Sequence, residues 1–301
     1  MKCLVTGGAG FIGSNLADKL LNDGHEVIVI DNESADSHDK FYWNEKAYNY
    51  KYDICDYNKC SEIFEKHKPE IVFHVAAEAR IQPCINNPLK AIETNVIGTG
   101  TILEMCRLHN VKRLIYSSTS SAYGLKNTPP LNEKMHNDCL NQYSISKTCG
   151  EELCKLYYKL YGLETIIFRY FNVYGERQPL KGKYAPVIGL FLRQHKANEP
   201  MTIIGDGEQR RDFTHVSDII SANILAAIFV EKNYEWGQLY NVGTGKNYSI
   251  NEIAKFIGCN TINIPTRPAE SRITLASIEK IKNDFGWEPK ISLEKWIAKN
   301  I

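Results

Sequence analysis

The sequence predicts an α/β fold in which a doubly wound parallel sheet carries a smaller α/β domain over one edge. Short apolar runs alternate with helical patterns from the N-terminus onward, and a glycine-rich turn follows the first run. This alternation is typical of βαβ units, whose strands are buried on both faces. After Tyr170 the elements become shorter and are separated by Gly, Pro and polar turns, which indicates the second domain.

Five apolar runs are predicted as strands of this sheet, at residues 2–6, 27–30, 71–75, 113–117 and 165–168. Helical patterns separate them, at about 11–22, 56–67, 89–109 and 143–161. Gly24 is placed to end the first helix, and the polar and aromatic residues 32–50 predict a long connection. We expect residues 1–170 and about 213–240 to form the first domain, and about 171–212 and 241–301 to form the second.

The composition is that of an ordinary globular protein, with 43% apolar residues in a chain of 301. Lys and Arg number 36 against 35 Asp and Glu, so a net charge of +1 argues against broad nucleic-acid binding. No apolar run approaches the roughly 20 residues that cross a membrane, and the first residues indicate a core strand, not a signal peptide. Nine cysteines without a Cys-x-x-Cys pair predict reduced thiols, a cytoplasmic location and no metal site.

The turn after the first strand has the glycine spacing of a dinucleotide-binding loop. It places Gly7, Gly10 and Gly13 where a tight turn lets the backbone approach a pyrophosphate, and the N-terminus of the next helix favours an anion. Asp31 follows the second strand, 18 residues past Gly13, where a carboxylate can bind a ribose diol. Because a carboxylate repels a 2′-phosphate and Asn32 and Glu33 supply no arginine, the sequence favours NAD over NADP.

A tyrosine and a lysine share one face of the predicted helix 143–161. Tyr143 and Lys147 are four residues apart. Because a nearby ammonium favours the phenolate, we expect the pKa of Tyr143 to lie well below its usual value of about 10. Tyr143 is therefore a candidate general base. The serine-rich segment 117–121 follows a strand, so its hydroxyls should lie at a carboxyl end, where doubly wound sheets bind their ligands.

These motifs resemble those of the extended short-chain dehydrogenase/reductases, and within them the nucleotide-sugar epimerases and dehydratases. UDP-hexose 4-epimerases are similar in pattern over essentially the whole chain. The motifs that carry the resemblance are TGGAGFIG, DN at 31–32, DI at 53–54, HVAA at 74–77, the serine-rich strand end, YSISK at 143–147, RYFNVYG at 169–175, GDGEQRRDFTHVSD at 205–218 and RPAE at 267–270. It implies a Rossmann fold with bound NAD and a UDP-sugar substrate. It also implies a homodimer formed by the helices at 89–109 and 143–161, which carry additional apolar residues such as Tyr157, Tyr158 and Leu160.

The resemblance also implies roles by position. The catalytic residues are Thr119, Tyr143 and Lys147, of which Lys147 also holds the nicotinamide ribose. The cofactor contacts are Gly7, Gly10, Phe11, Ile12, Gly13, Asp31, Asn32, Asp53, Ile54, Ala76, Ala77, Tyr143 and Lys147. The substrate contacts are Thr119, Asn172, Arg211, Arg267, Glu270 and Thr274. Arg211 and Arg267 would face the diphosphate, which suits guanidinium groups; Arg210 is an alternative to Arg211. Glu270 stands where the epimerases commonly have Asp.

The residues after Thr119 bear on the reaction. The similar 4,6-dehydratases have Asp-Glu directly after the threonine, and the similar decarboxylases have Glu two residues after the hydroxyl, whereas this chain has Ser120 and Ser121. The remaining set of base, hydroxyl and NAD is sufficient for 4-epimerisation, in which the 4-keto sugar turns over before the hydride returns. A dehydratase, a 4-ketosugar reductase and a non-catalytic NAD- or UDP-sugar-binding subunit are the alternatives.

The residue at position 274 bears on which sugar the enzyme would accept. In the 4-epimerases a bulky residue, often Tyr, lies seven positions after the Arg of the RP motif and narrows the pocket beside C2; counting from Arg267 gives Thr274. A small residue leaves room for an N-acetyl group, so we expect UDP-N-acetylhexosamines to be accepted alongside or ahead of UDP-hexoses. The flanking Ile273 and Leu275 are the alternatives if the alignment slips.

Overall fold

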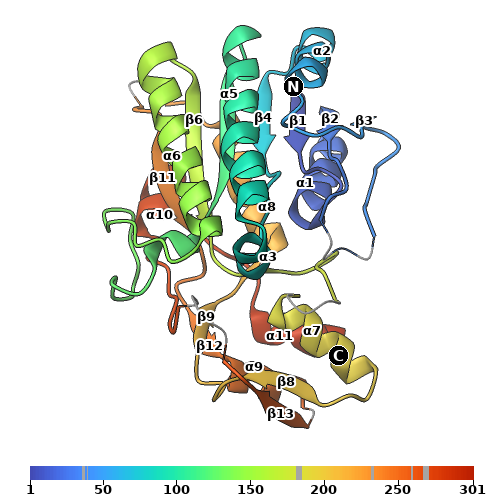
Figure 1. Cartoon of the computed structure of the whole chain (residues 1–301), viewed down its shortest axis with the longest axis vertical. Coiled ribbons are helices and arrows are strands. Elements are labelled where there is room, and N and C mark those ends of the chain that lie inside the picture. Colours follow the sequence, from blue (N-terminus) through green and yellow to red (C-terminus); the bar gives the residue numbers. More distant parts are fainter. Residues whose placement is uncertain (36–37, 39, 181–184, 232–233, 259, 267–270) are drawn as a thin grey trace.

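The computed structural model of the chain describes residues 1–35, 38, 40–180, 185–231, 234–258, 260–266 and 271–301. Within these residues, a seven-stranded parallel sheet has the order β11-β6-β5-β4-β1-β2-β3 (Figure 1). Its strands are β1 (Lys2–Thr6), β2 (Glu26–Ile30), β3 (Tyr48–Tyr50), β4 (Ile71–His74), β5 (Arg113–Thr119), β6 (Glu164–Tyr170) and β11 (Gln238–Val242). The strand order reverses between β1 and β4, which confirms the predicted doubly wound fold and places the ligand crevice at the carboxyl ends of these strands.

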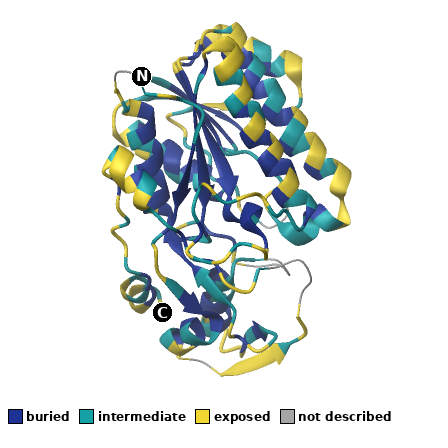
Figure 2. Cartoon of the chain, turned by 90° about the vertical axis from the view of Figure 1, so that its left-hand side faces the viewer, coloured by how far each residue is buried: buried dark blue, intermediate teal, exposed yellow. Residues whose placement is uncertain are grey.

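Helices cover both faces of the sheet. One face packs against α1 (Phe11–Asn22), α8 (Val216–Ile228) and α10 (Glu279–Phe285), and the other against α2 (Tyr57–His67), α5 (Thr99–Leu108) and α6 (Gln142–Tyr161). In β1, Cys3 and Val5 join the first apolar core and Leu4 joins the second. Burial on both faces explains the continuous apolar runs in the sequence. Figure 2 shows the buried strands between helices whose outer sides are exposed.

A smaller group of elements lies beyond the carboxyl ends of the strands, in the lower part of Figure 1. It contains β8 (Met201–Ile204), β9 (Arg210–Asp212), β12 (Asn247–Ser249), β13 (Thr261–Ile264), α7 (Val187–Lys196), α9 (Ile250–Ile257) and α11 (Leu293–Asn300). A third apolar core, with Phe191, Ile253 and Ile297 in it, holds this group together. Between the two groups, β7 (Val173–Tyr174) pairs with β10 (Thr214–His215). The cavity described below therefore has walls from both groups.

Two segments differ from the sequence prediction. Residues 32–50 include β3, which pairs with β2 at the sheet edge; Tyr48 and Asn49 are exposed, so the strand has no apolar pattern to reveal it. The predicted helix 89–109 is divided into α4 (Pro88–Ile92), a π-helical turn η1 (Glu93–Gly98) and α5. The π-helical turn presents Asn95, whose side chain binds both the backbone N–H and the C=O of Glu78, at 2.8 and 3.1 Å. Such turns are frequent near functional sites.

The described part of the chain contains no helix that is long and apolar enough to cross a membrane. Within the same residues, no group of three or more His, Cys, Asp or Glu side chains is placed to hold a metal ion. Every cysteine that the structure describes is a free thiol.

Candidate active site

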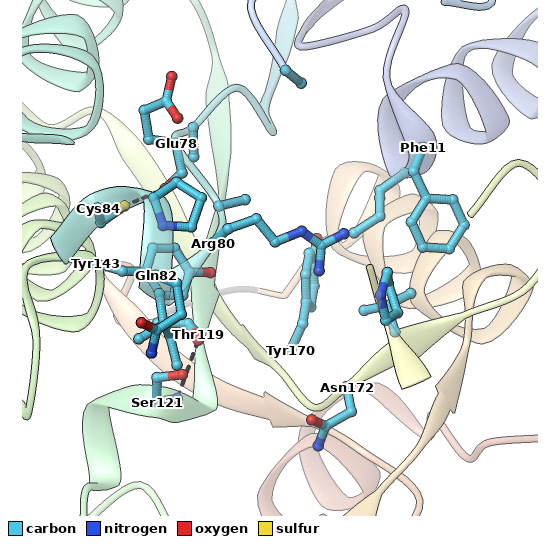
Figure 3. Close-up of a pocket in the computed structure, with 18 of the residues that line it drawn as sticks. Phe11, Glu78, Arg80, Gln82, Cys84, Thr119, Ser121, Tyr143, Tyr170 and Asn172 are labelled. Atoms are coloured by element: carbon cyan, nitrogen blue, oxygen red, sulfur yellow. Dashed lines mark hydrogen bonds between the residues drawn. The ribbon is translucent and has the colours of Figure 1, made fainter. Parts of the chain in front are cut away.

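A cavity of about 1000 Å³ lies at the carboxyl ends of the strands. Its lining includes the glycine turn after β1, the loops after β2, β4 and β5, the start of α6 and, from the smaller group, residues of β8, β9 and β13. Figure 3 shows Thr119, Tyr143, Tyr170 and Asn172 arranged around one part of this space. A cavity of this size, bounded by a few convergent polar groups, is typical of a cofactor or substrate site.

Two glycines of the turn have no room for a side chain. A Cβ on Gly7, whose φ is +65°, would lie 2.8 Å from the Ala76 backbone, and a Cβ on Gly13 would lie 2.1 Å from the Gly7 carbonyl oxygen. Helix α1 then begins at Phe11, with Gly10 as an N-cap that offers no side-chain hydrogen bond and with no acidic residue in the first turn. The uncapped N–H groups and the positive end of the helix dipole suit a phosphate.

Asp31 lies at the end of β2, beside the glycine turn. Its carboxylate accepts the backbone N–H groups of Ala9 at 3.0 Å and of Glu33 at 2.8 Å. Burial raises the pKa of this carboxyl, and the N–H donors oppose that shift. The Asn32 amide donates to Asp53 at 2.7 Å. The predicted cofactor contacts that line the cavity are Gly7, Gly10, Phe11, Ile12, Gly13, Asp31, Asn32, Ile54, Ala76, Ala77 and Tyr143, whereas Asp53 and Lys147 lie outside the lining.

The predicted catalytic residues converge where β5 ends and α6 begins. Thr119 is the last residue of β5 and its hydroxyl accepts the Ser121 N–H at 3.1 Å, at the start of the short 3₁₀ helix η2 (Ser120–Tyr123). Tyr143, in the first turn of α6, lies next to Thr119 (Figure 3). One turn later, the buried Lys147 Nζ lies 4.2 Å from the centre of the Tyr116 ring and has no hydrogen-bond partner in the described structure. A buried ammonium in this state is a donor for the hydroxyl groups of a ligand.

The predicted low pKa of Tyr143 is wrong for this chain. Burial raises the pKa of the phenol, an effect that the Thr119 hydroxyl opposes, and among charged groups Arg80 lowers it. Lys147 is not among the groups that shift the pKa of Tyr143, and burial lowers the pKa of Lys147 itself to about 7. The spacing in the sequence showed that Tyr143 and Lys147 share a helix face, but it did not show how deeply each side chain is buried.

Two of the predicted substrate contacts, Asn172 and Thr274, lie at the other end of the cavity. The Asn172 amide donates to the Asp212 carbonyl at 2.8 Å and to the Thr274 hydroxyl at 3.3 Å, and Thr274 is 8% exposed. Both Asn172 and Thr274 line the cavity. Arg267 and Glu270 lie outside the described residues.

The structure separates the two adjacent arginines of β9. Arg211 lines the cavity and donates to the Arg210 carbonyl at 3.0 Å. The Arg210 side chain instead donates to Asn247 at 2.9 Å and pairs with Glu252 at 3.0 Å, away from the cavity lining. The placement favours Arg211 over Arg210 as the side chain that meets a ligand.

The sequence prediction missed the residues that follow HVAA. Arg80 is the N-cap of α3 (Ile81–Asn86), and its side chain extends into the cavity between Tyr143 and Phe11 (Figure 3). Gln82 and Cys84, from the same short helix, also line the cavity. This segment has neither a clear periodicity nor a motif of its own, so its position directly after HVAA was the one signal that pointed to it.

Comparison with known proteins identifies the family. The model of the NAD-dependent epimerase/dehydratase family matches residues 3–243. The chain belongs to this family. A UDP-glucuronate 4-epimerase from Thermodesulfobacterium geofontis is 35% identical, over 99% of this chain and 94% of its own length. The structure of the UDP-glucose 4-epimerase of Thermotoga maritima with UDP-glucose has a TM-score of 0.92 and 36% identity, covering 99% of this chain and 96% of that one. The Thermus thermophilus UDP-glucose 4-epimerase in complex with NAD has a TM-score of 0.90 and 30% identity, with coverage of 99% and 96%.

Membership of the family confirms the predicted resemblance and the predicted cofactor, NAD. The residues present fit this cofactor. Gly10, directly before α1, lines the cavity, and a Cβ built there would come no closer than 3.5 Å to another atom, so the space beside the N-terminus of α1 suits a diphosphate. Asp31 lies at the strand end where a ribose would be held. The Lys147 ammonium, which is buried and has no partner in the described chain, is available to further hydroxyls.

Proposed function

We propose that the protein is an NAD-dependent 4-epimerase of a UDP-hexose or a UDP-N-acetylhexosamine. The observation that carries the proposal is the convergence of Tyr143 and Thr119 at one cavity without a free carboxylate beside them. Among the described lining residues, the carboxylates are Asp31, which accepts backbone N–H groups, and Glu78, which pairs with Lys90 at 3.3 Å. A base and a hydroxyl support reversible oxidation at C4, whereas elimination of water needs a further acid and base.

At the cofactor end, Asp31 would hold the adenosine ribose and Lys147 the nicotinamide ribose. NAD, when bound, supplies the hydride acceptor for C4 of the sugar. Tyr143 would accept the proton of the 4-hydroxyl as a phenolate, and Thr119 would orient that hydroxyl. Burial disfavours the phenolate in the chain alone, whereas the positively charged nicotinamide ring of bound NAD would favour it. The proton returns from Tyr143 when C4 is reduced on its opposite face. The chain therefore needs no acid or base beyond Tyr143 for this cycle.

At the substrate end, Asn172 and Arg211 would bind the diphosphate of the nucleotide sugar, with Arg267 and Glu270 proposed as further contacts. Anchoring of the diphosphate lets the 4-keto sugar turn over while the nucleotide stays in place. A guanidinium meets a diphosphate with paired donors, which gives both charge and orientation.

The proposed division of the chain into two domains corresponds to the cofactor end and the substrate end of the cavity. We propose that residues 1–170 and about 213–240 form the NAD-binding domain, and that about 171–212 and 241–301 form the nucleotide-sugar-binding domain. In support, α8 packs into the same apolar core as α1, whereas α7, α9 and α11 share a separate core. The exception within 241–301 is α10, because Ile281 lies in the core of the NAD-binding sheet.

The assignment is tested by incubating the purified protein with UDP-glucose or UDP-N-acetylglucosamine without added NAD. A 4-epimerase yields the C4 epimer, because each cycle regenerates the cofactor. Three outcomes would overturn the proposal: a 4-keto-6-deoxy product would identify a dehydratase, turnover that needs an added stoichiometric reductant or oxidant would identify a net redox enzyme, and no product would favour a binding subunit.

Thr274 should select for N-acetylated sugars. Its small side chain lines the cavity next to Asn172, so replacement by Tyr would fill that space and exclude an acetamido group by overlap. We expect the wild type to use UDP-N-acetylglucosamine, and Thr274→Tyr to lower kcat/KM for that substrate by about ten-fold or more while UDP-glucose is affected much less. Thr274→Ser, which keeps the hydroxyl, is the control. Equal losses for both sugars, or a wild type that rejects the acetylated sugar, would contradict this role.

We also propose that the protein is a homodimer. The segment from α4 to α6 carries large apolar side chains that remain exposed: Leu89, Ile92, Ile97, Leu108, Ile145, Leu156, Leu160 and Tyr161. Leu89 is 76% and Leu160 58% exposed, although both lie on regular helices. A second copy of the same face would bury them. Light scattering at micromolar concentration should therefore give twice the chain mass of 34.3 kDa, and a monomer would contradict the proposal.

A further inference from the structure

Arg80 places a positive charge inside the cavity without a protein counter-ion. Its guanidinium forms no hydrogen bond or ion pair with any residue that the structure describes. The carboxylates of the described lining are already engaged, since Glu78 pairs with Lys90 and Asp31 accepts two backbone N–H groups. A cation that lines a cavity without a counter-ion is available to an anionic ligand. The geometry therefore calls for an anionic ligand group at this guanidinium.

The direction of the Arg80 side chain shows toward which end of the cavity its guanidinium extends. In Figure 3 the Arg80 guanidinium lies between Tyr143 and Phe11, on one side of the Tyr170 ring, and Asn172 of the substrate end lies on the other side. Phe11 is the first residue of α1, whose N-terminus has no side-chain cap. The guanidinium thus extends from the loop after β4 toward the part of the cavity that suits the cofactor diphosphate.

The glycine turn leaves that diphosphate without a full positive charge. Residues 7–13 contain no Lys or Arg, and the N-terminus of α1 supplies only about half an elementary charge. Each of the two phosphates of NAD carries a negative charge. Of the other cations in the described lining, Lys90 is paired with Glu78 and Arg211 lies in β9 of the smaller group. Arg80 is the described cation that the fold directs toward the start of α1.

We propose that Arg80 binds the diphosphate of NAD opposite the N-terminus of α1, and so retains the cofactor in the cavity. A guanidinium offers paired donors to two phosphate oxygens. Retention matters for the proposed epimerase, since the cofactor must remain bound between the removal and the return of the hydride. The assignment deepens that function and rests on it for its purpose, but cofactor binding can be measured without any sugar.

The test compares the wild type with Arg80→Gln and Arg80→Lys, each freed of bound nucleotide. Titration calorimetry measures binding of NAD, of ADP-ribose, which keeps the diphosphate, and of adenosine, which lacks it. Arg80→Gln should weaken NAD and ADP-ribose by about ten- to a hundred-fold and leave adenosine unchanged, with Arg80→Lys in between. The affinity of Arg80→Gln for NAD should also fall less steeply with salt. Lys126→Gln removes one charge from a side chain that is 86% exposed and should change nothing.

An Arg80→Gln protein that binds NAD and ADP-ribose like the wild type would overturn the proposal. If that variant then lost kcat/KM for UDP-glucuronate but not for UDP-glucose, the guanidinium would belong to a sugar carboxylate instead. Circular dichroism of each variant distinguishes loss of the fold from loss of binding. Failure of the proposed 4-epimerase activity would appear as an absent epimer with the wild-type protein, and the binding comparison would still decide the role of Arg80.

Discussion

Replacing Tyr143 by Phe should lower kcat by about two orders of magnitude or more and leave NAD binding intact. The substitution removes one oxygen from a side chain that lies next to Thr119 at the cavity, and keeps its ring. The Lys147 Nζ makes no hydrogen bond to the phenol, so its proposed contact with the cofactor should persist. The measurements are steady-state turnover of the nucleotide sugar and the dissociation constant for NAD.

Tyr161→Phe provides the matched control for this prediction. Tyr161 ends the same helix, is 54% exposed and does not line the cavity, so loss of its hydroxyl should leave kcat unchanged. Turnover of Tyr143→Phe close to that of the wild type would show that another group accepts the proton, and the mechanism proposed above would be wrong.

Lys147→Ala should damage both cofactor binding and turnover. The buried ammonium has no partner in the described protein, so its proposed contacts are the ribose hydroxyls, and those are lost together with its packing over Tyr116. Lys147→Met keeps most of the side-chain volume and separates the two effects. The control on the same helix is Lys155→Ala, because Lys155 pairs with Glu152 at the surface. A Lys147→Met protein with wild-type affinity for NAD and wild-type turnover would refute the role.

The same lysine should give cofactor binding a pH dependence. Burial lowers the pKa of Lys147 to about 7, so the ammonium form is complete below that pH and is lost as the pH rises through it. The adjacent His74 has a pKa of about 3 and remains neutral, and the nearby Glu151 is paired with Arg169. Affinity for NAD should therefore weaken between about pH 7 and 9 in the wild type, and this part of the dependence should vanish in Lys147→Met.

The central sheet was predictable because its strands are buried on both faces. Residues 2–6, 27–30 and 71–75 are continuous apolar runs, and the structure has β1, β2 and β4 there, within one residue at their ends. β3 carried no such signal, since an edge strand with exposed Tyr48 and Asn49 can be polar. The π-helical turn was also invisible, because its extra residue does not change an apolar pattern enough to be noticed.

The site was predictable where chemistry depends on spacing along the chain. The glycine turn, Asp31 and the Tyr143–Lys147 pair were found in this way, and their roles stay predictions. The prediction of a low pKa for Tyr143 was wrong because burial raises this pKa, and burial depends on the assembled fold. Arg80 was missed for a related reason. The proposal for this residue depends on the lack of a carboxylate partner in the described cavity, which only the fold reveals.

The fate of the hydrogen at C4 tests the central claim most directly. UDP-glucose or UDP-N-acetylglucosamine labelled with deuterium at C4 is converted by the purified protein in ordinary water, with an excess of free unlabelled NADH. Reversible oxidation at C4 by a retained cofactor predicts that the deuterium remains at C4 of the epimer, because the same hydride returns to the sugar. Transfer of the label to water or to the free nicotinamide pool, or its absence from C4 of the product, would contradict the account.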